Sequence, residues 1–312
     1  MLAVGSNHPE SAMHIFDTHL HLFSRAFYEF QAGQVEGGDV AALLERLIHN
    51  GIEVPGDDMA ALRDRIIADL DAHGINRAVT FASVPGEMEV VGEAALTSGG
   101  RLIPFAMVDP TQPQTLDKLE SLQERYHFRG MLLFPAMRDY GIGDDVAVPA
   151  LDLARKHGMV VFVHCGLLRL NVRAALGLEP EFPLDRGHPQ DLIPVAKARP
   201  DQTFVVPHFG AGFFDEFLRL GKACPNVYAD TAGSNTWGMF QAPALYLEDL
   251  FEQAVEFFGV ERILYGSDTA GYPRGYRKDV LDAQTRAMQD AGIQPPDQGL
   301  ILGGNLSKLL EL

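Results

Sequence analysis

Short apolar runs alternate with helical patterns along almost the whole chain. Eight runs are typical of strands, because each is short, rich in β-branched or aromatic residues and bounded by turn residues. They span residues 15–21, 77–82, 102–108, 130–134, 159–164, 203–208, 227–230 and 262–268. Apolar residues at helical spacing predict helices at 40–49, 59–73, 115–126, 145–157, 189–198, 212–224, 244–258, 277–291 and 305–312.

The order of these elements predicts the fold class. Continuous apolar runs such as residues 159–163 are typical of parallel strands that are covered on both faces. Eight strand–helix units predict a (β/α)8 (TIM) barrel, a single domain over residues 14–312 after an N-terminal leader at 1–13. An open doubly wound sheet is the alternative, but no Gly-x-Gly-x-x-Gly follows any strand, which argues against dinucleotide binding.

Composition and charge narrow the possible partners. The chain is 46% hydrophobic and 21% charged, as in globular proteins, and no apolar run is long enough for a membrane span. A formal net charge of −17 argues against nucleic acid and anionic membranes as partners, which leaves a small-molecule substrate. The two cysteines, Cys165 and Cys224, form no disulfide framework, so we expect a cytoplasmic location.

Side chains that can bind metal stand at the ends of four predicted strands. His19 and His21 end the first strand on one face, and His164, His208 and Asp268 end the fifth, sixth and eighth. In a (β/α)8 barrel these carboxyl ends form the face that carries active sites. Imidazoles with one carboxylate suit zinc, manganese or iron rather than calcium. Each residue alone is more simply structural, and Asp268 alone would be a helix cap, but their conjunction predicts a metal site.

The same motifs resemble those of a known family. They are Asp17-x-His19-x-His21, the strand ends at His164 and His208, Tyr265-Gly266-Ser267-Asp268 and the closing segment 304–310. Together they resemble the amidohydrolase superfamily, and more narrowly the amidohydrolase-related group that includes aminocarboxymuconate-semialdehyde decarboxylase and γ-resorcylate decarboxylase. The resemblance covers nearly the whole chain.

The resemblance implies roles for individual residues. His19, His21, His164 and Asp268 would hold a divalent ion, zinc first, with manganese or iron as alternatives, and His208 would act beside it as acid/base and hydrogen-bond donor. Two-metal relatives bridge their ions with a modified lysine on the fourth strand, and residues 130–134 contain no lysine, so one ion is expected. By fold-level analogy we expect a homodimer.

The expected chemistry is hydrolysis of a C–N or C–O bond in an amide, lactone or ester. The metal would lower the pKa of bound water from 15.7 to roughly 7, Asp268 would pass the water proton to the leaving group, and His208 would stabilise the oxyanion. The alternative is non-oxidative decarboxylation of an aromatic or unsaturated acid, with His208 or Asp268 protonating carbon. A barrel that only binds a ligand is a third hypothesis, which the five filled polar positions disfavour.

Substrate-binding residues are expected in the loops that follow the strands. Arg169 is the first choice to clamp a substrate carboxylate, because it lies closest in sequence to His164, and Arg274 and Tyr272 follow the eighth strand. Trp237 would line or cover the pocket, although packing explains it equally well. Asp230, at the end of the seventh strand, is either a partner of a ligand histidine or a local cap.

Overall fold

The computed structural model describes residues 14–312, and the leader expected at residues 1–13 lies outside them. Its strands form one parallel sheet in the order β8-β7-β6-β5-β4-β3-β2-β1-β9. They are β1 Ile15–His21, β2 Ile75–Phe81, β3 Leu102–Met107, β4 Gly130–Leu133, β5 Val160–Val163, β6 Phe204–Val206, β7 Val227–Asp230, β8 Ile263–Leu264 and β9 Thr269–Ala270. Since β9 continues from β8 and pairs with β1, the sheet closes on itself and confirms the predicted (β/α)8 barrel.

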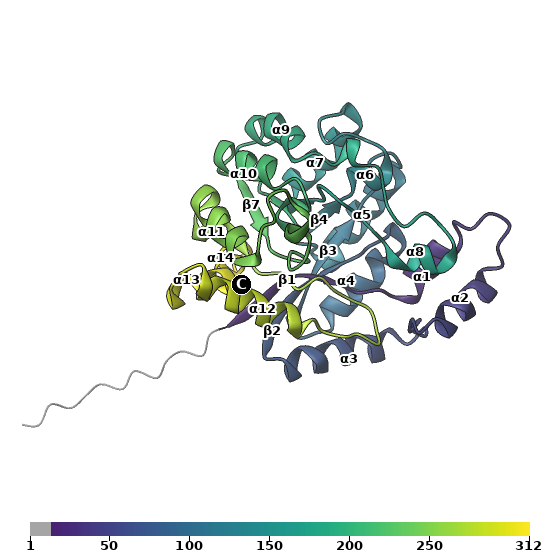
Figure 1. The fold of residues 1–312 in the computed structure, drawn as a ribbon. Coiled ribbons are helices and arrows are strands. Elements are labelled where there is room, and N and C mark those ends of the chain that lie inside the picture. Colours follow the sequence, from purple (N-terminus) through teal and green to yellow (C-terminus); the bar gives the residue numbers. More distant parts are fainter. Residues whose placement is uncertain (1–13) are drawn as a thin grey trace, which may run out of the picture.

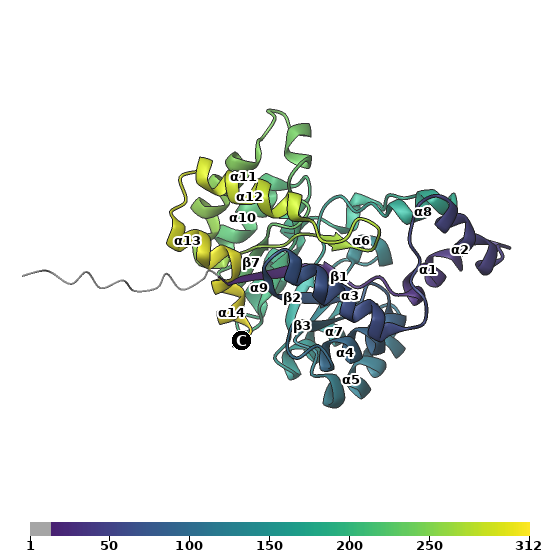
Figure 2. The same ribbon diagram turned by 90° about the horizontal axis from the view of Figure 1, so that it is seen from below.

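Eight helices surround the strands, one after each of β1 to β7 and one after the interrupted β8–β9 segment (Figures 1 and 2). They are α3 Met59–Ala72, α4 Met88–Leu96, α5 Gln114–Tyr126, α7 Val148–Lys156, α9 Leu192–Ala198, α10 Phe214–Ala223, α11 Leu247–Phe258 and α12 Lys278–Asp290. Two short helices, α13 Pro295–Gly299 and α14 Asn305–Leu309, end the chain, and α6 Pro135–Arg138 follows β4. None of the helices in residues 14–312 combines the length and hydropathy that crossing a bilayer requires.

The predicted eighth strand, residues 262–268, is interrupted in the structure. Only Ile263 and Leu264 extend the ladder, and the chain rejoins it at Thr269. The gap arises because Asp268 adopts a left-handed backbone conformation with φ of 57°. Its amide donates to the carbonyl of His19 at 3.0 Å, so the break places Asp268 directly beside β1.

Aromatic side chains fill the barrel beneath the predicted site. Phe81, Phe105 and Phe162 are fully buried and meet edge to face, with ring centroids 5.0–5.6 Å apart. This is the favoured geometry for aromatic pairs. The ring of His19 lies 4.9 Å from that of Phe81, so the aromatic cluster supports one predicted ligand from below.

Two long loops fold into a separate unit beside the barrel mouth, which we call the cap. It consists of α1 Arg25–Ala32, α2 Val40–His49 and α8 Asn171–Leu176, which lie together in both views (Figures 1 and 2). Its own buried cluster contains Phe27, Tyr28, Ala32, Leu44, Leu47, Val84, Val172 and Leu176. The sequence pattern predicted α2 but no helix at α1 or α8, so the cap as a unit is an addition to the predicted architecture.

Candidate metal centre

Three predicted ligands form a compact group at the barrel mouth. The Nε2 atoms of His19 and His21 are 3.2 Å apart, and Asp268 Oδ1 lies 3.9 Å from the first and 3.8 Å from the second. All three atoms lie within 4.8 Å of one another, as ligands of a single ion must. His19 is 1% exposed, whereas the Asp268 side chain is 36% exposed. The carboxylate is therefore the ligand most open to a substrate.

The closure of the barrel brings these ligands together. Thr18 N donates to the carbonyl of Tyr265 at 2.8 Å, and Ser267 N donates to Asp17 Oδ1 at 3.0 Å. Asp17 also accepts the amide of His19 at 2.9 Å, and the register of β1 against β2 shifts between Asp17 and Leu20. Strict alternation would place Asp17 beside the histidines. Instead, this fully buried carboxyl ties the first strand to the last.

A buried carboxylate orients His19. The Nδ1 of His19 donates to Asp230 Oδ2 at 2.5 Å, and both side chains are almost fully buried. Burial lowers the pKa of His19, but the charge and hydrogen bond of Asp230 outweigh it and raise the pKa overall. With Nδ1 holding the proton, Nε2 is left as an electron-rich ligand. The geometry supports both interpretations of Asp230, because Oδ2 holds His19 while Oδ1 accepts the amide of Ala232 at 2.7 Å as a local cap.

Ser83, which the sequence reasoning missed, orients His21. Its Oγ lies 2.7 Å from Nδ1 of His21, immediately after β2. Burial and, to a smaller extent, neighbouring His19 lower the pKa of His21 to about 3, so the imidazole is neutral. A serine after a strand is too common to single out from sequence. The only signal in the sequence is that Ser83 follows a strand at the face of the barrel that carries the predicted ligands.

The spacing of the two histidines fits a shared cation. Each Nδ1 already has another partner, and the two Nε2 atoms face one another. In a tetrahedral zinc site with Zn–N bonds of about 2.0–2.1 Å, ligand nitrogens are roughly 3.3 Å apart. The observed separation is 3.2 Å. The donor set therefore suits a small divalent ion.

His164 and His208 complete the predicted set. His164 follows β5 and is 4% exposed, and its buried Nδ1 has no hydrogen-bond partner among the described residues, as expected of a ligand atom. It lies outside the three-atom group, but its ring is 5.0 Å from that of His208. His208 has a left-handed backbone with φ of 62°, and its Nδ1 donates to the carbonyl of Ala232 at 2.7 Å. That bond leaves Nε2 of His208 as its reactive nitrogen.

Electrostatics favour a neutral imidazole beside an ionised carboxylate. Burial lowers the pKa of His208. Burial alone would raise the pKa of Asp268, but the surrounding imidazoles of His208, His19 and His21 lower it below its usual range. Both groups are therefore in the form that accepts protons at neutral pH.

All five predicted side chains line one cavity of about 540 Å³. Its walls are largely apolar and include Phe23, Leu132, Phe134 and Met137 from the barrel side. The cap contributes Phe27, Tyr28, Ile52, Leu168, Leu170 and Val172. The site is thus a mostly hydrophobic pocket with a few convergent polar groups, the usual form of a small-molecule site.

The four predicted substrate-binding residues also line this cavity. Arg169, however, is half exposed and forms an ion pair with Glu181 at 2.5 Å, so its charge is already neutralised. Trp237 Nε1 donates to the carbonyl of His208 at 3.1 Å, which makes Trp237 a support for that histidine. Among the described residues, Arg274 has only a long contact of 3.5 Å with the carbonyl of Asp268. Arg274 is therefore freer than Arg169 to meet an anionic group.

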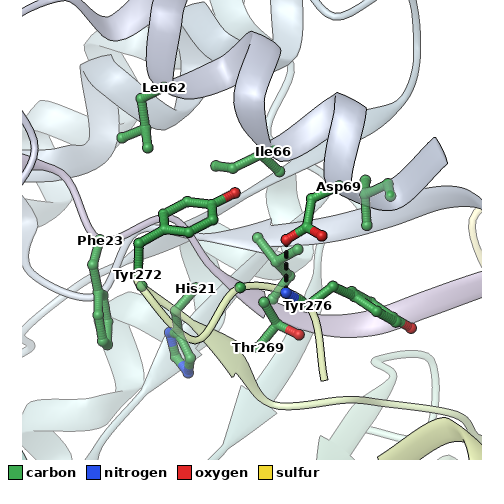
Figure 3. A pocket seen from close by; sticks show the side chains of 12 residues that line it. His21, Phe23, Leu62, Ile66, Asp69, Thr269, Tyr272 and Tyr276 are labelled. Atoms are coloured by element: carbon green, nitrogen blue, oxygen red, sulfur yellow. Dashed lines mark hydrogen bonds between the residues drawn. The ribbon is translucent and has the colours of Figure 1, made fainter. Parts of the chain in front are cut away.

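Tyr272 divides the cavity from a smaller pocket of about 20 Å³, which is room for one water. Figure 3 shows its ring between His21 and Leu62 of α3. The Arg65 guanidinium lies 3.6 Å from the ring centroid, and Asp69 accepts the amide of Tyr276 at 2.7 Å. These contacts fasten the loop after β9 to α3, which fixes Tyr272 as part of the wall.

Comparison with known proteins agrees with the resemblance seen in the motifs. The sequence profile of the amidohydrolase family matches residues 16–312. The chain belongs to this family. A search found no significant match among curated protein sequences.

Solved structures with the same fold include both hydrolases and decarboxylases. A 5-carboxyvanillate decarboxylase from Novosphingobium aromaticivorans, complexed with manganese and a nitrobenzoic acid, has a TM-score of 0.66 at 15% identity, over 97% of each chain. A zinc-bound amidohydrolase from Burkholderia multivorans scores 0.64 at 14% identity, over 96% of this chain and 99% of its own. A probable 2-pyrone-4,6-dicarboxylic acid hydrolase from Acinetobacter baumannii scores 0.62 at 17% identity, over 96% of this chain and 100% of its own. At these identities the comparisons establish the fold alone.

Proposed function

We propose that this amidohydrolase is a metal-dependent hydrolase that cleaves a C–N or C–O bond in a small amide, lactone or ester. The observation that carries the proposal is the position of the Asp268 carboxylate. It lies beside the paired Nε2 atoms of His19 and His21 and opens onto the same cavity as His208. A proton acceptor and a cation site thus face one substrate space.

The residues that would hold the ion are His19, His21, His164 and Asp268. When bound, a divalent cation polarises a carbonyl group and makes water more acidic. We favour zinc because of the nitrogen-rich donor set and the 3.2 Å spacing of the first two ligands, with manganese or iron as alternatives. One ion is proposed, because β4 contributes apolar residues such as Leu132 to the cavity and contains no lysine.

Asp268 and His208 would share the proton transfers. Asp268, whose pKa is lowered by neighbouring imidazoles, accepts the proton of the attacking water and delivers it to the leaving nitrogen or oxygen. His208 keeps one proton on Nδ1 for the carbonyl of Ala232, so it donates through Nε2 only as an imidazolium. We therefore propose that His208 takes a second proton from solvent as negative charge develops on the substrate oxygen, stabilises that oxyanion as an imidazolium, and returns the proton to solvent afterwards.

Non-oxidative decarboxylation of an aromatic or unsaturated acid is the second candidate. Phe23, Trp237 and Tyr272 line the cavity, and Arg274 stands at its edge for a carboxylate, as a planar aromatic acid requires. That reaction needs a group that protonates carbon from the resting state. The proton-accepting forms of His208 and Asp268 favour hydrolysis instead.

A product-resolved assay tests the proposal. The protein would be loaded with zinc or manganese and incubated with a panel of lactones, amides, esters and aromatic acids, with released acid or amine and released carbon dioxide measured separately. We expect hydrolysis products without carbon dioxide, and no product from Asp268→Asn. Carbon dioxide release would favour the second candidate, and inactivity on every compound would favour a binding protein. A homodimer in the cytoplasm remains our expectation for the assembled enzyme.

A further inference from the structure

The two ligand histidines of β1 are held by different kinds of partner. A carboxylate, Asp230, fixes His19, whereas a neutral hydroxyl, Ser83, fixes His21. A hydroxyl rotates freely unless its own residue is anchored. The orientation of His21 therefore depends on what holds Ser83.

Glu87 holds Ser83 in place. It ends the 3-10 turn Pro85–Glu87, and its side chain is fully buried. Its Oε2 accepts the amide of Ser83 at 2.9 Å, and its Oε1 accepts both the amide and the hydroxyl of Ser24 at 2.8 Å. Ser24 follows His21 by three residues, so one carboxyl group ties the segments after β1 and β2 on either side of this histidine.

Joining two loops through a buried carboxyl group has a high cost in free energy. Burying a carboxylate is unfavourable unless hydrogen bonds or an opposite charge compensate it. Glu87 forms hydrogen bonds with uncharged donors, and no lysine or arginine in residues 14–312 forms an ion pair with it. Glu87 thus has no cationic partner among the described residues and is linked to the proposed ligand His21 through Ser83. We take this as an indication that Glu87 positions the side chains of the site.

We propose that Glu87 is a positioning residue for the metal centre and acts on His21 through Ser83. By fixing the Ser83 backbone, Glu87 aims the hydroxyl at Nδ1 of His21. Nδ1 then carries the proton, and Nε2 stays directed at the ion shared with His19. The inference rests on the metal-binding part of the proposed function and not on the reaction.

Zinc affinity tests the proposal directly. The dissociation constant of zinc would be measured by competition with a chromogenic chelator for the full-length wild type, Ser83→Ala, Ser83→Thr and Glu87→Gln. We expect Ser83→Ala and Glu87→Gln to weaken binding about 10–100-fold, as removal of outer partners of metal ligands typically does. Ser83→Thr keeps the hydroxyl and should restore most of the affinity. Glu89→Gln is the matched control, because Glu89 is a surface residue that pairs only with Lys118.

Two further measurements separate positioning from simple stability. The melting temperature of each metal-free variant reports folding, and nitrogen-15 NMR of the His21 ring reports which nitrogen carries the proton. The double variant Ser83→Ala/Glu87→Gln should bind zinc no more weakly than Ser83→Ala alone, because both changes act through one hydroxyl. Zinc affinity within twofold of wild type in Ser83→Ala would overturn the proposal. If Glu87→Gln does not fold, the alanine and threonine variants still decide it, and a wild type that binds no metal would refute the metal centre itself.

Discussion

At the barrel mouth, the four histidines differ in what their ring nitrogens contact. His19 and His21 direct Nε2 toward each other and toward Asp268. His164 has a buried Nδ1 without a hydrogen-bond partner in the part of the chain that the structure describes. His208 instead anchors Nδ1 on a backbone carbonyl, which suits a residue that handles protons next to the ion.

Alanine substitution should separate these roles. His19→Ala removes a ligand and should abolish metal binding, whereas His208→Ala should retain the metal and reduce turnover at least 100-fold. Metal content after dialysis, measured by plasma mass spectrometry, and turnover on the substrate found in the panel assay would check both. Loss of the ion from His208→Ala would show that this assignment of roles is wrong.

The sequence predicted the side chains of this site better than their supports. His19, His21, His164, His208 and Asp268 could be found because histidine and aspartate are uncommon at the ends of apolar strands. Their positioning partners could not, because serine and glutamate are common in loops and their hydrogen bonds depend on tertiary structure. Arg169 was predicted to bind substrate because it is close to His164 in sequence. In the structure its guanidinium instead pairs with Glu181, a contact that the sequence does not reveal.

Among the elements, the interrupted last strand matters most for the site. Gly266 lies in the gap between β8 and β9, and a Cβ there would collide with Asp230 Oδ1 and lie 2.9 Å from the Cβ of His19. The break therefore requires glycine at this point, because the partner of a metal ligand occupies the space that a side chain would need.

Gly266→Ala should weaken metal binding through displacement of Asp230. We expect a loss of at least tenfold in zinc affinity, together with a destabilisation of about 1–3 kcal/mol from overpacking. Chelator competition and denaturant unfolding would measure the two effects. Gly143→Ala is the control, since the nearest atom to its Cβ lies at 3.9 Å, and it should change neither quantity. Wild-type affinity in Gly266→Ala would contradict the close packing described here.

The 3-10 turn Pro85–Glu87 should make stability depend on pH. Burial raises the pKa of Glu87 from 4.5 to about 7. The folded chain thus binds a proton more tightly than the unfolded chain, so the Glu87 contribution is greatest below pH 4.5 and is lost as the pH rises to about 7.

Between these limits the contribution changes by on the order of 3 kcal/mol. The measurement is the free energy of unfolding of metal-free wild type minus that of Glu87→Gln, across pH 4.5–7.5. This difference should fall as the pH rises. A difference that is constant with pH would show that Glu87 titrates normally.

Sequence patterns located the buried strands but missed some helices for identifiable reasons. The strands are continuous apolar runs, which remain visible whatever packs against them. Helix α4 has only a narrow polar stripe, Glu89 and Glu93, to reveal its period, because Val91, Gly92, Ala94 and Ala95 are all buried. Its Gly92 packs against the ring of Tyr126, so tertiary contact rather than local pattern explains this helix.

On the scale of the whole molecule, the barrel and the cap have separate hydrophobic clusters that share one cavity. The barrel supplies the proposed metal ligands, and the cap supplies apolar residues of the cavity wall such as Phe27 and Val172. Since the two clusters are distinct, the cap can be weakened without disturbing the ligands.

Leu47→Ala should loosen the cap alone. Leu47 is fully buried in the cap cluster, so its truncation should destabilise the cap by about 2–4 kcal/mol. We expect faster proteolysis within α1 and α2 and a raised KM, with metal content unchanged. Ile48→Ala is the control, since Ile48 is 54% exposed, and it should behave as wild type. Loss of metal from Leu47→Ala would instead show that cap and barrel fold as one unit.

The contact between Asp268 and His19 also has a consequence for synthesis on the ribosome. The first strand emerges early and can pair with β2, but its other edge has no partner strand until residues 265–270 have been translated. Until then the growing polypeptide has an open barrel and lacks Asp268, one of the four proposed metal ligands. Binding of the ion therefore depends on synthesis of the last segment. A prematurely terminated chain would have neither a closed barrel nor the complete set of proposed metal ligands.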